Sequence, residues 1–313
     1  DSVFNGVTVV QLGQGSDSIY LNHIEVEGCG YGTYDSTDGI YQASLATNPS
    51  FDIKVTNSWI HDVSRNGLTL GGHQGTGFTE GNIGFLFENN RLERTGGTTY
   101  PDWHGQGVQI YGGTDDYMVF RKNKFIDITG TGYIAFLGNT VHRNVRIYDN
   151  LFYSTDRAKF FTSPGVITFL ASGTSVDNAK IYNNTFNNID LKGITILAPG
   201  TNNEVRNNLF ANSNFSYGIT TLIAGNPGLI STNNAYYNNT YNSSAIWRDY
   251  NEIGYRAETT DPFINAAGAD FHLKSTSNSV NNGAILGNDF ATDYAGTPRP
   301  QGSGWDIGAY EYY

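Results

Sequence analysis

Residues 180–186 read KIYNNTF, and variants of this heptapeptide recur along the chain. The copies are LFENNRL (86–92), VFRKNKF (119–125), RIYDNLF (146–152), EVRNNLF (204–210) and ISTNNAY (230–236), with shorter forms IYLNHI (19–24) and KVTNSW (54–59). The aligned Asn residues are Asn22, Asn57, Asn90, Asn123, Asn150, Asn184, Asn208 and Asn234. Successive members lie 24 to 35 residues apart. A period of this length predicts a solenoid in which each repeat forms one coil.

A second landmark falls once in each repeat, a Gly that opens another alternation of apolar and polar residues. These are Gly39, Gly67, Gly107, Gly132, Gly165, Gly193 and Gly218. Alternation with period two predicts short strands with one buried face, and helical periodicity is nearly absent. Asn suits the bend between strands because it tolerates a left-handed backbone and its amide can hydrogen-bond to copies above and below. The chain is therefore expected to be all-β, with about eight stacked parallel coils.

These units resemble those of right-handed parallel β-helix proteins, the pectin-lyase-like superfamily of pectate lyases, polygalacturonases, alginate-modifying enzymes and phage tailspikes. The resemblance covers about residues 5–240 and implies a right-handed parallel β-helix. It implies no single activity, because this fold carries many.

The end of the chain carries a second resemblance. Residues 261–313 contain DFHL, PRPQG and DIGAYE, and are similar to the closing segment of many secreted bacterial β-helix proteins. We therefore expect a β-helix at 1–240 and a C-terminal segment at 241–313 that packs on the last coils and covers the last open rung. The resemblance implies a secreted, extracellular protein of bacterial type, and the start at Asp1 suits a mature product. The sequence begins abruptly at the first coil, and two alternatives stay open: an N-terminal cap is missing from it, or the uncapped coil self-associates or docks on a partner.

Composition narrows the choice of partners. The chain has 18 Lys plus Arg against 29 Asp plus Glu, a formal charge of −11. That balance disfavours nucleic acid and anionic membranes, which attract basic faces. No apolar run reaches the roughly 18 residues of a membrane span, so no membrane insertion is expected.

Insertions concentrate in one turn of the coil. From the repeat Asn to the repeat Gly the gaps are 17, 10, 17, 9, 15, 9 and 10 residues. Coils one, three and five therefore carry extra residues, within 23–38, 91–106 and 151–164. Coils stack about 4.8 Å apart, so three enlarged turns on alternate coils predict walls around a groove roughly 20 Å long over five rungs. Such a groove suits an extended polysaccharide.

The enlarged turn of coil three, the central wall of this groove, contains the most candidate catalytic and sugar-binding residues. TTYPDWHGQ (98–106) places Tyr100 and Trp103 where they could stack on sugar rings, and Asp102 and His104 two residues apart on one side of an extended segment. The alternatives are that the aromatics cover the loop's own backbone and that Asp102 caps a turn. Gln106 is a further candidate for substrate contact.

Neighbouring coils supply other candidates. IHDVSRNG (60–67) contributes Asp62 as a catalytic candidate, and FIDITGTG (125–132) contributes Asp127 at a similar position. Substrate-binding candidates in the other turns are His61, Arg65, Asn66, Asp38, Arg157 and Lys159. The alternatives are that each Asp caps its bend and that the charges are solvated.

Three turns also resemble those of polygalacturonase-type pectinases. STDGI (36–40) is similar to that family's Asn-Thr-Asp-Gly, HGQGVQI (104–110) to its Gly-His-Gly segment and VRIYDN (145–150) to its Arg-Ile-Lys. This resemblance implies functional roles for Asp38 and His104. The family's Gly-Asp-Asp doublet is missing, the Gly-His-Gly is not intact and Tyr148 stands in place of the Lys. YPDWH (100–104) is loosely similar to the Asp-Pro-His-Asp motif of alginate epimerases, without its second acid.

The sequence thus favours a secreted polysaccharide-processing enzyme, either a hydrolase or a lyase. A hydrolase would pair Asp62 or Asp127 with Asp102 across neighbouring coils. A lyase would use His104 as a base, with Arg65, Arg157, Lys159 or calcium neutralising a uronate. No cofactor is required; for calcium, Asp115 and Asp116 are the candidates. The alternative is a non-catalytic glycan-binding, adhesin or filament-forming β-helix.

Overall fold

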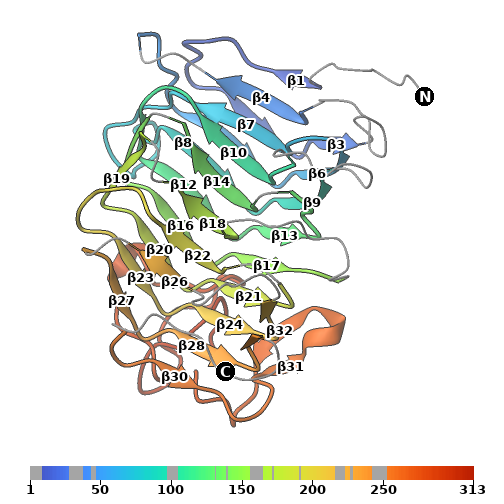
Figure 1. The fold of residues 1–313 in the computed structure, drawn as a ribbon, viewed down its shortest axis with the longest axis vertical. Coiled ribbons are helices and arrows are strands. Elements are labelled where there is room, and N and C mark those ends of the chain that lie inside the picture. Colours follow the sequence, from blue (N-terminus) through green and yellow to red (C-terminus); the bar gives the residue numbers. More distant parts are fainter. Residues whose placement is uncertain are drawn as a thin grey trace.

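A computed structural model describes residues 9–27, 38–43, 47–96, 105–130, 132–138, 140–155, 165–170, 173–189, 192–215, 223–225, 228–241 and 252–313. Within these ranges the chain forms a stack of coils, each of which visits three parallel sheets in the same order (Figure 1). The N-terminal coils lie at one end of the stack and the C-terminal coils at the other. The expectation of an all-β parallel β-helix is confirmed.

Sheet A contains eight strands among the described residues: β1 (Val10–Gln11), β4 (Ile40–Ala43), β7 (Leu68–Gly71), β10 (Val108–Tyr111), β14 (Ile134–Leu137), β18 (Ile167–Phe169), β22 (Ile194–Ile196) and β26 (Ile223–Gly225). Sheet B also contains eight there: β2 (Tyr20–Asn22), β5 (Ile53–Thr56), β8 (Phe85–Glu88), β12 (Met118–Arg121), β16 (Arg146–Tyr148), β20 (Lys180–Tyr182), β23 (Glu204–Arg206) and β27 (Ile230–Thr232).

Sheet C contains nine strands in the described part of the chain: β3 (Glu25–Glu27), β6 (Trp59–Val63), β9 (Arg91–Thr95), β13 (Lys124–Ile126), β17 (Leu151–Tyr153), β21 (Thr185–Asn187), β24 (Leu209–Ala211), β28 (Ala235–Tyr237) and β30 (Arg256–Ala257). Smaller sheets are formed by β11 (Asp115–Asp116), β15 (Val141–Arg143) and β19 (Ser175–Asp177), by β25 (Asn214–Phe215) and β29 (Thr240–Tyr241), and by the antiparallel pair β31 (Phe263–Asn265) and β32 (Asp270–Leu273). Two short 3₁₀ helices, η2 (Ala266–Gly268) and η3 (Asn288–Phe290), lie in the C-terminal segment.

The corner between sheets B and C contains the Asn ladder. Six Asn side chains in successive coils are buried, and each donates its amide to the carbonyl oxygen of the next, at 2.9 to 3.2 Å. They are Asn90, Asn123, Asn150, Asn184, Asn208 and Asn234. The carboxylate of Glu252 accepts the last amide, at 2.8 Å. Stacked amides thus pair the polar groups of the corner, which would otherwise be buried without partners.

Two details of the predicted ladder are wrong. The left-handed residue is the one before each ladder Asn, as at Asn89, Asn183 and Asn207, and not the ladder Asn itself. In coil two Asn57 occupies that left-handed position, so Ser58 takes the ladder site and donates its backbone amide to Asn90. Asn22 and Asn57 are exposed and bond to each other outside the coil, at 2.8 Å.

The repeated Gly positions also align only in part. Gly39, Gly67 and Gly107 stack directly, because a Cβ on Gly67 would lie 2.7 Å from the carbonyl oxygen of Gly107. In coil four, however, Val108 pairs with Ile134, so Tyr133 takes the position of Gly107 and Gly132 lies one residue earlier. Gly218 lies outside the described residues.

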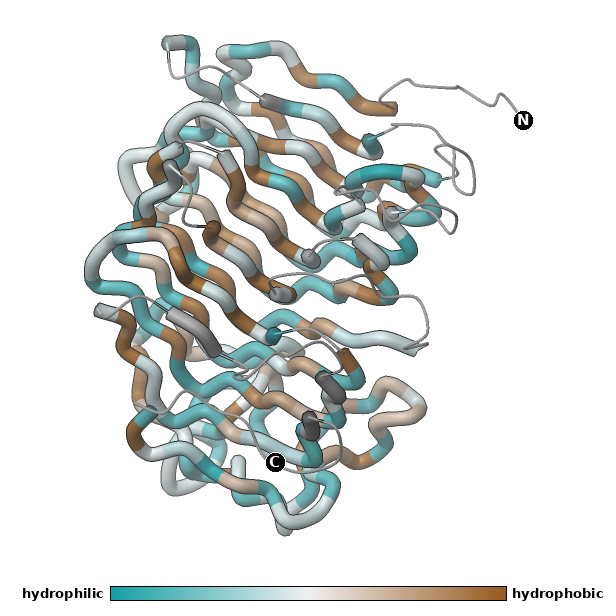
Figure 2. The backbone as a smooth tube through the Cα atoms, in the orientation of Figure 1, coloured by the Kyte–Doolittle hydropathy of each residue, from teal (hydrophilic) through white to brown (hydrophobic). Residues whose placement is uncertain are grey.

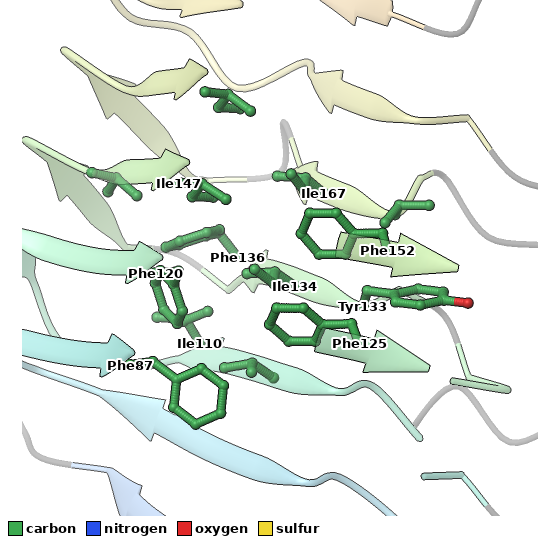
Figure 3. Packing of buried hydrophobic residues seen from close by; sticks show 14 of the residues in the cluster. Phe87, Ile110, Phe120, Phe125, Tyr133, Ile134, Phe136, Ile147, Phe152 and Ile167 are labelled. Atoms are coloured by element: carbon green, nitrogen blue, oxygen red, sulfur yellow. The ribbon is translucent and has the colours of Figure 1, made fainter. Parts of the chain in front are cut away.

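The core is a column of side chains that repeats from coil to coil. In sheet C, Phe125, Phe152, Phe186, Phe210 and Tyr236 stack with ring centroids 4.6 to 5.5 Å apart. Figure 3 shows Phe125 and Phe152 beside Ile134 and Ile167 of sheet A. The strands carry the hydrophobic residues in bands across the stack, and the turns are hydrophilic (Figure 2). The inward positions of the strands therefore supply one continuous apolar core.

The C-terminal segment lies along the side of the stack. Its Phe263, Phe271 and Tyr310 pack against outward residues of sheet C such as Leu151 and Leu209. Buried Arg299 of this segment bonds to Asp149 of coil five at 3.2 Å. Within the segment the same guanidinium bonds to Glu311 at 2.6 Å. Its first described residues lie on the last coil, where β30 pairs with β28 and Glu252 accepts from Asn234. Its later contacts run along the flank, from Lys122 to Asn233. That the whole segment serves as a cover for the last rung stays a prediction. The division at residue 240 stays a prediction.

This cover divides the outer face of sheet C in two. From coil four onward the outward positions are largely apolar and buried beneath the C-terminal segment, as at Ile126, Leu151 and Leu209. In the first three coils the same positions hold charged and aromatic residues: Glu25, Glu27, Trp59, His61, Arg91 and Glu93. None of the helices in the described ranges has the length and hydrophobicity needed to cross a bilayer.

Candidate functional site

The candidate site lies at the turn between sheets C and A, where the insertions fall. Residues 97–104 leave the rung of coil three at Gly96 and return at Gly105. A Cβ on Gly105 would lie 2.6 Å from the Cα of Gly96, and a Cβ on Gly130 only 2.2 Å from the carbonyl oxygen of Gly105. The backbones of coils three and four therefore touch here. The rung is closed between Gly96 and Gly105. The eight residues GTTYPDWH between them lie outside the described residues, and the gap lengths predict that they are an insertion.

Asn66 of coil two holds the rung of coil three at Gly105 and Gln106. Its Oδ1 accepts the backbone amides of Gly105 and Gln106, each at 3.1 Å, and its Nδ2 donates to Thr69 and Gln109 at 2.9 and 2.5 Å. The side chain is fully buried and uses all four of its hydrogen-bonding positions. We expected Asn66 to contact substrate; here it anchors the loop, and a ligand would have to break these bonds.

Asp38 and Arg65 form an ion pair next to Asn66. The buried Asp38 carboxylate accepts from Arg65 Nη1 and from the backbone amide of Asn66, both at 3.2 Å. The Arg65 side chain is 28% exposed, so it can reach a ligand at the edge while Asp38 orients it. Gln106, another predicted substrate contact, is fully buried.

Asp62 is the left-handed residue near the end of β6, one position before Val63. Arg94 of coil three donates to both of its oxygens, with Nε and Nη2 each at 2.6 Å, and His61 Nδ1 lies 2.6 Å away. The two-pronged bond from Arg94 holds the pKa of Asp62 below its usual range, with a smaller contribution from His61 and against the effect of burial. Asp62 is therefore an ionised, oriented carboxylate, and its lowered pKa makes it a weak base.

Asp127 occupies the equivalent corner of coil four, two coils away, because Ile60, Leu92 and Phe125 pair in register. It accepts from the Thr155 backbone amide at 2.6 Å and from the hydroxyls of Thr155 and Ser154 at 2.5 and 2.9 Å. This is the capping arrangement that the sequence left open as the alternative. Aligned residues two coils apart are separated by roughly 10 Å, with Arg94 between them.

Several predicted site residues lie outside the described part of the chain. They are the catalytic candidates Asp102 and His104 and the substrate-binding candidates Tyr100, Trp103, Arg157 and Lys159. Their roles stay predictions. The described ends of their loops fix where these residues are attached, on the same edge as Asp62 and Asp127.

The structure does not bring the calcium candidates together. Asp115 points into the core, fully buried between His142 at 3.0 Å and His73 at 3.5 Å. The two imidazoles hold its pKa down to about 2, although burial alone would raise it. Asp116 points outward and pairs with Arg143 and Asn144. Neighbouring strand residues face opposite sides, so these two carboxylates do not converge on one ion.

Arg94 and Trp59 are the residues that sequence reasoning missed. Arg94 occupies the same corner position as Asp62 and Asp127, and aligning the coils on Ile60, Leu92 and Phe125 would have revealed it. Trp59 stacks on His61 at 3.8 Å and lies beneath the Arg91 guanidinium at 5.1 Å. Beside it a shallow hollow of about 540 Å³ extends over Glu25, Trp59 and Arg91 to Tyr294 of the C-terminal segment.

Strand pairing defines the class of this chain, a parallel β-helix. No protein-family model matches the chain, and no curated protein matches it in sequence. Among solved structures it is similar to the Streptococcus pneumoniae surface protein and adhesin PfbA, with a TM-score of 0.45 and 15% identity. The match covers 81% of this chain but only 63% of PfbA. The fold is assigned here from the strand pairing alone.

Proposed function

We propose that the protein is a secreted, extracellular polysaccharide-processing enzyme of the pectin-lyase-like type. It binds an extended glycan across the turns between sheets C and A and cleaves it there. The observation that carries this proposal is the closed rung at Gly96, Gly105 and Asn66. Between Gly96 and Gly105 the sequence adds two aromatics, an acid and an imidazole. Rigid scaffolds that present such loops are typical of binding and catalytic sites.

For hydrolysis, Asp62 would be the ionised carboxylate of the pair, and a weak base because Arg94 holds its pKa low. The proton donor would then be Asp102, and inverting enzymes separate the two carboxyl groups by roughly 6.5–9.5 Å. For β-elimination, His104 would take the proton next to a uronate carboxylate, and Arg65, Arg157 or Lys159 would neutralise that carboxylate. Both routes use the same edge and differ in the product.

A second candidate function is glycan binding without turnover. The observation in its favour is that each described edge carboxylate is already bonded to protein groups: Asp62 to Arg94, Asp127 to Thr155, and Asp38 to Arg65. A general acid usually needs a raised pKa. The pKa of Asp62 is lowered instead by its bonds to Arg94, so a hydrolase would obtain its acid from loop 97–104.

The test is a panel of neutral and uronate polysaccharides, scored for binding, for new reducing ends and for the ultraviolet absorbance of an unsaturated uronate. If cleavage occurs, Asp102→Asn and His104→Ala should each lower the rate by at least roughly a hundredfold, the size of a lost acid–base contribution. Asp289→Asn and His272→Ala, on the C-terminal segment, serve as matched controls. Binding without products would establish the second function, and unchanged rates in both loop variants would remove this loop from the mechanism.

A further inference from the structure

Three metal-ligating side chains meet on the outer face of sheet C in the first two coils. Glu25 and Glu27 lie two residues apart on β3 and point to the same side, and His61 on β6 pairs in register with Glu27. One ligand atom from each lies within 4.8 Å of the other two. The group is separate from loop 97–104, and its description does not depend on the proposed function.

The orientation of His61 is fixed by its neighbours. Its Nδ1 lies 2.6 Å from the Asp62 carboxylate, which only accepts hydrogen bonds when ionised, so Nδ1 carries the proton. Arg94 in turn holds Asp62 through two bonds. The ring is 3% exposed and packs on Trp59. A carboxylate that orients a histidine through Nδ1 is the usual outer partner of a metal-bound imidazole.

The other ring nitrogen faces a carboxylate. Nε2 of His61 lies 3.2 Å from Oε1 of Glu25. In a neutral imidazole with Nδ1 protonated, both of these atoms are electron-pair donors, so a cation has to lie between them, either a proton or a metal ion. In a tetrahedral site with bonds of 2.0–2.1 Å, neighbouring ligand atoms are about 3.3 Å apart. The observed separation therefore suits a metal of zinc size.

The charge balance also leaves room for a dication. Arg91 and Arg94 are the guanidiniums here, and both bond to Glu93, with Arg94 also on Asp62. The carboxylates of this face are those of Glu25, Glu27, Asp62 and Glu93. Four carboxylates and two guanidiniums give a net charge of −2 when the imidazole is neutral, which one divalent ion would offset.

We propose that Glu25, Glu27 and His61 form a binding site for one divalent transition-metal ion of the zinc type. One imidazole nitrogen with two carboxylate oxygens is a ligand set for zinc or manganese, whereas calcium takes six to eight oxygens. The Glu25 side chain is 56% exposed, so the site opens to solvent on one side. That side leaves a coordination position for water or for an oxygen of a bound ligand.

The test is isothermal titration of the untagged, full-length chain with ZnCl₂, and with MnCl₂ and CaCl₂ in parallel. We expect one zinc per chain, loss of that binding in His61→Gln and in Glu27→Gln, and weaker binding of calcium than of zinc. His272→Gln is the matched control, because His272 pairs with Asp270 at 2.6 Å but belongs to no three-ligand group among the described residues.

The variant Asp62→Asn tests whether His61 is a metal ligand oriented by Asp62 or only one member of a structural ion pair. It leaves all three ligands in place, so it should retain one zinc per chain with about 10- to 100-fold weaker affinity. Circular dichroism checks that each variant is folded. The proposal is overturned if the wild-type chain binds no zinc, or if folded His61→Gln binds zinc as the wild type does. Equal zinc loss in His272→Gln would also overturn it, because the ion would then belong elsewhere.

Discussion

Replacing one ladder residue, Asn184→Ala, tests what holds the coils together. The Asn184 side chain is fully buried and makes four hydrogen bonds. Its Oδ1 accepts the backbone and side-chain amides of Asn150, both at 3.0 Å, and its Nδ2 donates to Ile147 O and Asn208 Oδ1, both at 2.9 Å. The substitution removes all four without changing the backbone preference of the corner.

The expected loss follows from which partners are left without a bond. Asn150 Nδ2 keeps bonds to Phe120 and Tyr148, and Asn208 Oδ1 keeps the Asn184 backbone amide. The Asn150 backbone amide and the Ile147 carbonyl lose the ladder bond. At about 1–3 kcal/mol for each of these two buried groups, the free energy of unfolding should fall by about 2–6 kcal/mol.

The neighbouring residue supplies a matched control. Asn183 is equally buried and has a left-handed backbone. Its side-chain amide, unlike that of Asn184, has no hydrogen-bond partner in the described part of the chain. Asn183→Gly keeps that backbone conformation and should change stability by less than about 1 kcal/mol. Urea unfolding followed by circular dichroism gives both values. Equal losses in the two variants would refute the ladder as the source of stability.

Three further predictions follow from the core, the C-terminal segment and the loop anchor. Phe152→Ala empties the ring column between Phe125 and Phe186 and should cost about 3–5 kcal/mol in urea unfolding; a loss below about 1 kcal/mol would contradict the packing. Burial raises the pKa of Asp149 to about 7 from 3.8, despite the opposing pull of Arg299. Its contribution to stability is therefore full below about pH 4 and is lost as pH rises through 7. Asp149→Asn should gain stability relative to wild type across that range, and a pH-independent difference would refute this. Asn66→Ala should weaken polysaccharide binding about tenfold, equivalent to roughly 1.4 kcal/mol for a lost positioning bond, whereas unchanged binding would separate this anchor from the site.

The fold could be predicted because every coil repeats the same physical requirements. Inward strand positions must be apolar and one corner must pair its buried polar groups, so the KIYNNTF pattern marks each coil. The register failed in coil two for a physical reason. Asn serves both the left-handed position and the ladder position, and Asn57 alone does not reveal which it occupies. In coil one Asn22 takes neither position, because it pairs with Thr56 and His23 is the left-handed residue.

The candidate site was less predictable. Asp62 and Asp127 could be aligned from sequence, but their partners come from other coils: Arg94 on one and Thr155 on the other. The uncovered face of sheet C depends on where the C-terminal segment ends its contacts, and no local pattern encodes this. Outward Ile126 and Leu151 are apolar because that segment covers them, whereas Glu25 and Trp59 are not covered.

The most direct measurement is a crystal structure of the chain with a bound oligosaccharide from the polysaccharide panel. The proposed function predicts sugar rings along the edge between sheets C and A, over the row Asp62, Arg94 and Asp127, with Trp103 stacked on a ring and Asp102 or His104 at the linkage. Sugar bound on another face, with this edge bare, would contradict the proposal.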